Sequence, residues 1–290
     1  MRALLISDIS SDLPGGAQAS NKLIIEKGKE LGFDIQELNL LSSRLPLSFQ
    51  HDVIISSNFE WFYTNNPYND THLILDKILN HPFHVRYEHD SCTYLSNQDR
   101  KTLYNSTKIN FFLSDFHLKF FKQNYGEIFY NNEIVYDPID TDIFIPKDCE
   151  KEYDVIYCGY AHELKGFNEF IKYSEKNLDK KIAFIGWFDK ATEHLIPKLQ
   201  NAKNITDLGR REPNEIPQYL QKTKYIFHQP NLNEPFCRMV AEGLLCGCEL
   251  IGKGDIIGSY LEYQKHGHEK FKQKCSEAAD TFWQKIKEKL

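Results

Sequence analysis

The chain lacks several features that would indicate whole classes of protein. No run of about 18 consecutive apolar residues occurs, so no segment has the composition of a membrane-spanning helix. The formal net charge is −6, whereas a nucleic-acid-binding domain usually carries a basic stripe. The seven cysteines are scattered and no Cys-x-x-Cys pair occurs, which favours free thiols in a reducing cytoplasm over a metal centre. We therefore expect a cytoplasmic protein without a nucleic-acid partner.

What the 290 residues do contain is a repeated alternation of strand-like and helix-like segments. Short apolar runs without strict alternation are typical of strands buried on both faces of a parallel sheet. In the first half these runs are Ala3–Ile6, Val53–Ser56, His84–Tyr87, Ile109–Leu113 and Glu133–Tyr136. Helix-length segments such as Ala19–Leu31 lie between them. The pattern predicts a doubly wound α/β fold.

The composition becomes polar and charged at residues 146–153, PKDCEKEY, and the α/β rhythm then restarts. A polar stretch between two such series is a natural linker. We predict a first Rossmann-like domain at residues 1–147 and a second at residues 148–267, with a cleft between them as the expected ligand site.

Residues 268–290 form a predicted C-terminal helix with one apolar face. Its apolar residues recur at steps of three and four: Phe271, Cys275, Ala278, Phe282, Ile286 and Leu290. We expect this helix to return to the first domain and pack there. Because its other side is rich in lysine, peripheral contact with a membrane is the alternative.

Two glutamates with seven residues between them, Glu234 and Glu242, are the strongest candidates for a binding site. Pro235 suits a position near a helix start, which would place Glu234 in the preceding loop and Glu242 on the helix. The N-terminus of a helix offers unpaired N–H groups that bind phosphates. A nearby carboxylate can accept hydrogen bonds from two neighbouring sugar hydroxyls. The alternative is that both are ordinary surface glutamates.

The segment Tyr225–Ile251, YIFHQPNLNEPFCRMVAEGLLCGCELI, resembles the donor-site signature of retaining GT-B glycosyltransferases of the family 4 type, the glycosyl transferases group 1. Glu234 and Glu242 match the two glutamates of its E-x₇-E pattern. The resemblance implies that both hold hydroxyls of a nucleotide-sugar donor, and that Pro235, Phe236 and Cys237 line the donor site. Pro235 and Cys237 replace the usual glycines, which makes the phosphate side the part that differs from relatives.

The segment VIYCGYAHELKG, residues 155–166, resembles the family's turn after the first strand of the donor domain. Lys165 matches the lysine that neutralises the donor diphosphate, where a fixed ammonium favours departure of the nucleotide. Tyr160 stands where the family carries an arginine, and Arg238 or Arg86 are candidates to replace that cation. Arg210 lies in a segment that edges the base in relatives and could stack on it. Solvated side chains are the alternative for Lys165 and Arg210.

The first half resembles the same family. Gly15 and Gly16 follow the first strand and match a glycine-rich loop where backbone approaches phosphate or acceptor. Residues 85–90, VRYEHD, resemble a motif in which His89 orients the transferred sugar, with Glu88 and Asp90 as acceptor-binding carboxylates or base. For His89 the alternative is a structural histidine at a strand end. Trp61 is a further candidate for acceptor contact.

These resemblances imply a retaining glycosyltransferase that moves a sugar from a nucleoside-diphosphate-sugar to a hydroxyl of a glycan, a glycolipid or other lipid-linked acceptor, or a protein glycan. Since the pattern relies on Lys165 and helix N-termini for the diphosphate, we expect no metal and no cofactor. Two alternatives are an epimerase or phosphorylase on the same fold and a catalytically silent sugar-nucleotide binder, which the missing arginine at Tyr160 would favour.

Overall fold

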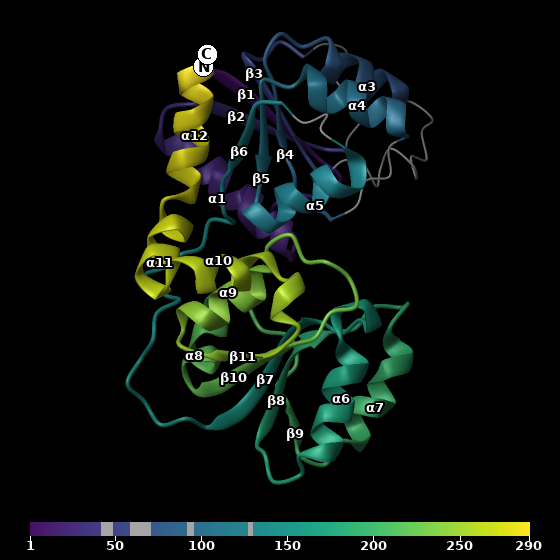
Figure 1. Ribbon diagram of the computed structural model, residues 1–290, viewed down its shortest axis with the longest axis vertical. Coiled ribbons are helices and arrows are strands. Elements are labelled where there is room, and N and C mark those ends of the chain that lie inside the picture. The colour runs from purple at the N-terminus through teal and green to yellow at the C-terminus, as the bar shows by residue number, and fades with distance from the viewer. Residues whose placement is uncertain (42–48, 59–70, 92–95, 127–129) are drawn as a thin grey trace. The chain divides into compact units, whose positions relative to one another are not determined.

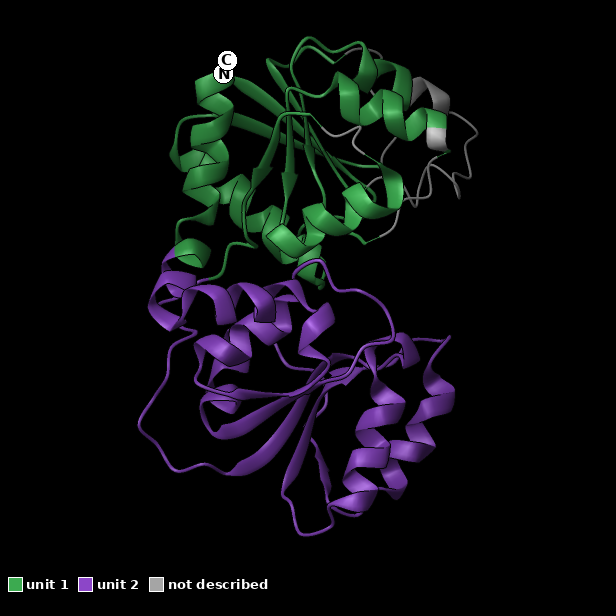
Figure 2. Ribbon diagram, viewed as in Figure 1, with its two compact units in different colours: residues 1–139, 274–290 green, residues 140–273 purple. Residues whose placement is uncertain are grey.

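The computed structural model describes residues 1–41, 49–58, 71–91, 96–126 and 130–290. The chain divides into two compact units, of which unit 1 comprises residues 1–139 and 274–290 and unit 2 comprises residues 140–273 (Figure 2). Each unit contains one sheet with helices packed beside it (Figure 1). In the described parts of the chain, no helix is both long enough and apolar enough to cross a bilayer.

Unit 1 is built on a six-stranded parallel sheet. Its strands are β1 (Arg2–Ser7), β2 (Asp34–Asn39), β3 (Val53–Ser57), β4 (His84–Tyr87), β5 (Ile109–Phe112) and β6 (Asn132–Ile134), in the order β2-β1-β3-β4-β5-β6. Its helices are α1 (Gly16–Glu30), α3 (Thr71–Leu79), α4 (Asn97–Ser106), α5 (Asp115–Tyr125) and α12 (Ala278–Lys289). Every strand pair is parallel, so all six carboxyl ends lie at one edge.

Unit 2 is built on a five-stranded parallel sheet. Its strands are β7 (Tyr153–Tyr160), β8 (Ile182–Trp187), β9 (Ile205–Asp207), β10 (Thr223–His228) and β11 (Glu249–Gly252), in the order β11-β10-β7-β8-β9. The helices are α6 (Phe167–Lys176), α7 (Ile196–Asn201), α8 (Ile216–Gln221), α9 (Arg238–Leu245) and α10 (Gly258–His266), and α11 (His268–Ser276) follows them. The two parallel sheets confirm the α/β prediction.

Aromatic side chains dominate the core of unit 2. Helix α6 buries Phe167, Phe170 and Ile171 at helical spacing, and these pack with Tyr157 and Phe184 of the sheet. Complete burial of one such side chain stabilises the fold by roughly 1.5–3 kcal/mol. This packing fixes β7 and β8 and therefore the loops at their carboxyl ends.

The C-terminal segment consists of two helices rather than one. Helix α11 ends at Ser276 and α12 begins at Ala278. In unit 1, the indole N–H of Trp283 donates to the carbonyl of Ile24 on α1 at 2.8 Å. A Cβ at Gly28 would lie 2.5 Å from the Trp283 ring, so a glycine in α1 allows this contact.

Candidate functional site

The loop between β10 and α9 carries Glu234 at the carboxyl edge of the unit 2 sheet. Its backbone is pinned to the chain that precedes α10: Glu234 N–H donates to the carbonyl of Ile256, and Gly258 N–H donates to the carbonyl of Glu234, both at 2.9 Å. The residue is 5% exposed. A carboxylate held so firmly and so deeply requires partners for its charge.

Two partners meet on one oxygen of this carboxylate. The ammonium of Lys165 lies 2.8 Å from Oε1, and Nε2 of His228 lies 3.3 Å from the same atom. Burial by itself raises the pKa of Glu234, but the hydrogen bond from His228 and the positive charge of Lys165 outweigh it and hold the pKa at about 2. Glu234 is therefore an anion at every physiological pH.

Lys165 is placed beside Glu234 by a short helical turn, Glu163–Lys165, which follows β7. The next residue, Gly166, has a φ of 84°, in the left-handed region that glycine adopts freely. A Cβ at Gly166 would lie 2.2 Å from the carbonyl oxygen of Gln229, so glycine lets the turn pack against the chain after β10. Asn231 N–H closes the contact by donating to the carbonyl of Leu164 at 2.9 Å.

The residues that lead into α9 are tightly placed. Phe236 is buried and stacks on Phe271, with ring centres 6.1 Å apart. Cys237 caps the helix with a φ of 69°, a left-handed conformation that costs a residue other than glycine about 1–2 kcal/mol. Ser259 fixes both carbonyls, since its N–H donates to Phe236 and its hydroxyl to Cys237. Pro235 lies in the loop before them, three residues ahead of the first residue of α9.

Glu242 lies on α9, one turn after Arg238. The guanidinium Nε of Arg238 donates to its Oε1 at 2.8 Å, and both side chains are more than four-fifths buried. Arg238, a candidate for the missing phosphate cation, is thus also the partner that fixes the second motif glutamate. Glu234, Cys237 and the first residues of α9 all follow β10, at the carboxyl edge of the unit 2 sheet.

Tyr160 and Arg210 lie together at the ends of β7 and β9, beside Trp187. The rings of Tyr160 and Trp187 stack with centres 5.8 Å apart, and the Arg210 guanidinium lies 5.9 Å from the Trp187 ring centre. Burial and a hydrogen bond to Asp189 raise the pKa of Tyr160, so the phenol stays neutral. Arg210 is exposed.

In unit 1, the loop after β4 is organised by Glu88. Its Oε1 accepts the backbone N–H groups of His89 at 3.0 Å and Asp90 at 3.1 Å. Its Oε2 accepts two bonds from Arg86, at 3.1 and 2.8 Å, and one from the hydroxyl of Tyr104. Burial opposes ionisation, but the Arg86 charge lowers the pKa of Glu88 below its usual value. This places Arg86, the other candidate for the missing cation, in a buried ion pair of unit 1.

His89 itself is buried and lies near the carboxylate of Asp137, a residue that was not predicted as part of the site. Its Nδ1 lies 3.7 Å from Oδ1 of Asp137, which also accepts the Ser20 hydroxyl at 2.7 Å. The ring packs edge-on against Tyr87 with centres 4.2 Å apart. The ring of His89 is therefore held against Tyr87 after β4, near the carboxylate of Asp137.

The remaining unit 1 candidates lie at the same carboxyl edge. Gly15 caps α1 and Gly16 begins it, and within the described residues no side chain caps this helix N-terminus. Asp90 is exposed, and its carboxylate accepts from the amide of Asn58 at 3.4 Å. Asp8, which was not predicted, follows β1 and is 8% exposed; burial raises its pKa to about 6. Trp61 lies outside the described residues.

The family model for glycosyl transferases group 1 matches residues 139–290, and no curated protein matches the chain. Among solved structures, the Anabaena protein HepE in complex with UDP-glucose is 15% identical with a TM-score of 0.66, over 99% of this chain and 91% of that one.

Two further structures share the fold. Sucrose-phosphate synthase from Thermosynechococcus elongatus is 9% identical with a TM-score of 0.67, over 98% of this chain and 96% of that one. An alpha-glucosyltransferase in complex with UDP and a 13-mer DNA is 14% identical with a TM-score of 0.58, over 99% of each chain. At these identities the likeness shows the fold alone.

Proposed function

For this chain, which belongs to the glycosyl transferases group 1 family and is a glycosyltransferase, we propose that it moves a sugar from a nucleoside-diphosphate-sugar to an acceptor hydroxyl with retained anomeric configuration. The observation that carries this proposal is the Lys165–Glu234 pair at the carboxyl edge of the unit 2 sheet. Ligands of open α/β sheets bind at that edge.

The two members of the pair have different tasks. Glu234, anionic and fixed, accepts hydrogen bonds from hydroxyls of the donor sugar, and Glu242 does the same for a second pair of hydroxyls. Lys165 neutralises the diphosphate, whose charge grows as the glycosidic bond breaks. The N-terminus of α9, the positive end of the helix dipole, follows Glu234 in the chain and adds favourable charge for the diphosphate. Gly15, Gly16, His89 and Asp90 are the substrate contacts that we assign to unit 1.

The donor class is supported by the neighbours' own ligands. HepE is solved with UDP-glucose and the alpha-glucosyltransferase with UDP, so a uridine diphosphate sugar is the first donor to test. The latter is also bound to DNA, but the net charge of −6 here does not favour a nucleic-acid acceptor. We propose a glycan or a lipid-linked saccharide as the acceptor.

We propose that transfer needs no metal, because Lys165 and the α9 N-terminus supply positive charge for the diphosphate. One Asp-x-Asp sequence is present, at Asp140 and Asp142, both of which are exposed; Asp140 accepts the backbone N–H of Asp142 at 3.0 Å and so forms a turn. Full turnover after exhaustive treatment with a chelator is the expected result. Activity that disappears with the chelator and returns with Mg²⁺ or Mn²⁺ would contradict metal independence.

The test of the whole proposal is release of sugar from a panel of nucleoside-diphosphate-sugars, with water or a simple glycoside as acceptor. We expect one donor to be consumed, the first-formed product to keep the donor's anomeric configuration by NMR, and Glu234→Gln to slow the reaction by about 10–100-fold or more. Epimerised donor without release would instead indicate an epimerase. Tight donor binding without any turnover would indicate a silent binder, the reading that Tyr160 favours.

A further inference from the structure

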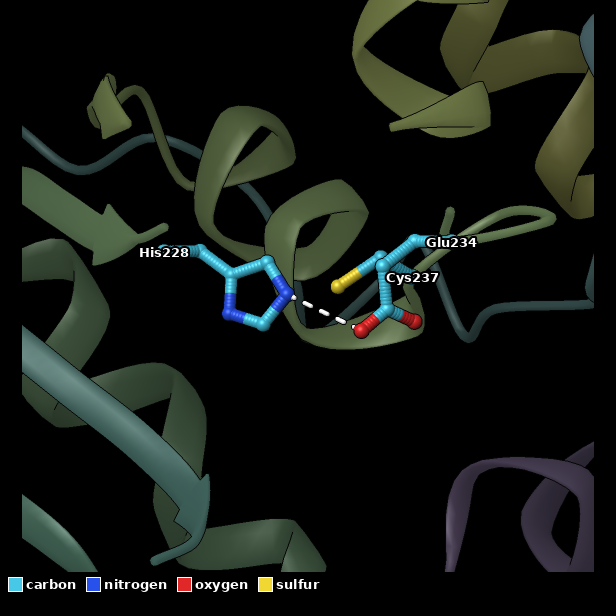
Figure 3. Close-up of side chains that lie close together, drawn as sticks. All are labelled: His228, Glu234 and Cys237. Carbon is cyan, nitrogen blue, oxygen red and sulfur yellow. Dashed lines mark hydrogen bonds and ion pairs between the residues drawn. The ribbon is translucent and has the colours of Figure 1, made fainter. Parts of the chain in front are cut away.

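Three side chains of different chemistry converge beside Lys165. His228 ends β10, Glu234 lies in the following loop, and Cys237 caps α9. One ligand atom from each, imidazole nitrogen, carboxylate oxygen and thiol sulfur, lies within 4.8 Å of the other two. Figure 3 shows the ring, the carboxylate and the sulfur directed toward one another.

This donor set is the one that zinc and similar borderline divalent ions prefer. Such ions bind imidazole nitrogen and carboxylate oxygen at about 2.0–2.2 Å and thiolate sulfur at about 2.3 Å, in tetrahedral geometry that sets neighbouring ligands about 3.3–3.7 Å apart. His228 Nε2 and Glu234 Oε1 are already 3.3 Å apart. Mg²⁺ and Ca²⁺ favour oxygen ligands and fit a nitrogen–sulfur set poorly.

We propose that His228, Glu234 and Cys237 form an inhibitory site for a thiophilic divalent cation such as Zn²⁺. The ion binds the neutral imidazole, the carboxylate and the thiolate, and the thiol proton passes to solvent. The fourth position is left to water. Because the ion occupies the carboxylate that the donor sugar requires, it and the donor exclude one another.

Lys165 sets the affinity of this site. Its ammonium lies 2.8 Å from the same Glu234 oxygen that the ion would take, and its side chain is 40% exposed. The ammonium can therefore turn outward into solvent when the ion enters, but its charge opposes the ion. The site is thus weaker than a dedicated zinc centre, as suits reversible inhibition.

The backbone of Cys237 supplies a decisive variant. Its φ of 69° suits glycine, so Cys237→Gly removes the sulfur without straining the chain. His228→Gln keeps an N–H that can donate to Glu234. Cys149→Ser removes an exposed cysteine elsewhere in unit 2 and is the matched control.

The first experiment titrates the full-length, chelator-stripped protein with Zn²⁺ against a chromophoric chelator, and with Co²⁺ by absorption. We expect one ion per chain and a thiolate-to-cobalt charge-transfer band. Cys237→Gly should abolish the band, and it and His228→Gln should weaken Zn²⁺ binding by about 10–100-fold or more, since loss of even an outer-shell partner costs that much. Cys149→Ser should behave as the parent. Equal binding by Cys237→Gly and the parent overturns the proposal.

The second experiment uses Lys165→Gln. Removal of a positive charge next to the ion should tighten Zn²⁺ binding by about tenfold. A merely adventitious surface ion would not respond to this change, so unchanged or weaker binding contradicts the site.

The inhibitory role rests on the proposed function and is tested separately. Zn²⁺ should inhibit sugar release competitively with the donor, and Cys237→Gly should be insensitive to it. If Zn²⁺ binds as described but no donor is turned over in chelator, the proposed function fails and the metal site stands. If turnover is normal and Zn²⁺ does not bind at His228 and Cys237, the metal site fails alone.

Discussion

Both units of the chain contain a buried carboxylate paired with a cation at the carboxyl edge of the sheet, Glu88 with Arg86 and Glu234 with Lys165, and the two pairs differ in how many oxygens of the carboxylate accept hydrogen bonds. In unit 1, Glu88 accepts hydrogen bonds on both oxygens, and it and Arg86 are each 1% exposed. In unit 2, the partners of Glu234 within the described residues all meet Oε1, and Lys165 is 40% exposed. A carboxylate with both oxygens engaged holds a loop in place, whereas one with an oxygen left over and a movable cation can bind a ligand.

The largest expected effect tests the unit 1 half of this comparison. Arg86→Met leaves Glu88 charged and buried without its ion-pair partner, which should lower the free energy of unfolding by about 3–5 kcal/mol. Lys165→Met, the matched change in unit 2, should cost less, because Glu234 keeps its hydrogen bond with His228 and the ammonium that is removed is 40% exposed. Urea unfolding followed by circular dichroism measures both. Equal losses in the two variants would refute the distinction.

The next effect belongs to unit 2 and concerns activity. Glu234→Gln keeps the size of the side chain but removes a charged acceptor, worth about 1.5–3 kcal/mol per hydrogen bond, so kcat/KM for the donor should fall by about 10–100-fold or more. The fold should persist, which the melting temperature will report. If the loss of activity is explained by unfolding of the variant, Glu234 has a structural role and does not bind the donor.

A smaller effect separates the units by pH. Glu234 has a lowered pKa of about 2, so its stabilising interactions are present above its unfolded value, near 4.5, and are lost as pH falls toward 2. Asp8 has a pKa raised to about 6, so its protonated form favours the fold below its unfolded value, near 3.8, and that contribution is lost as pH rises through about 6.

Asp8→Asn should therefore stabilise the protein at pH 7.5 by about 1–2 kcal/mol in the free energy of unfolding, which raises the melting temperature. At pH 4 the same substitution should change the melting temperature little. Glu234→Gln should do the reverse, with its cost visible at pH 7.5 and shrinking as the pH falls below 4. Thermal melts at both pH values decide this. If Asp8→Asn stabilises the protein equally at pH 7.5 and pH 4, the buried charge of Asp8 is not the cause of the stabilisation.

The smallest expected effect concerns the helix cap. Cys237→Gly releases the backbone strain of a left-handed residue and should leave stability unchanged or raise it by up to about 1 kcal/mol. Denaturant midpoints compared with those of Cys149→Ser measure the difference. A clear destabilisation would mean that contacts of the Cys237 side chain outweigh the strain.

The sequence predicted most of the sheets because continuous apolar runs mark strands buried on both faces. It missed β2, where buried and exposed residues alternate (DIQELN), since an edge strand lacks such a run. It also merged α11 and α12, because the helical period of apolar residues continues across Glu277.

Within the candidate site, motif spacing singled out Lys165 and Glu234, and the structure brings them into contact. The roles of His228 and Asp137 were not predicted, although each ends or follows a strand. Their partners are 6 and 48 residues away, and no local pattern records which side chains meet at the carboxyl edge of a sheet. Arg86 was considered as a phosphate ligand, but its pairing with Glu88 depends on burial, which a short motif does not encode.

Calorimetry with UDP and UDP-glucose, or with the corresponding ligands of whichever base the panel selects, measures whether Lys165 binds the phosphate end of the donor and Glu234 the sugar end. Lys165→Gln should weaken binding of both the nucleotide and the nucleotide-sugar. Glu234→Gln should weaken only the nucleotide-sugar and leave the nucleotide bound as in the parent. If Glu234→Gln weakens both ligands equally, or leaves binding of the nucleotide-sugar unchanged, Glu234 does not bind the sugar of the donor.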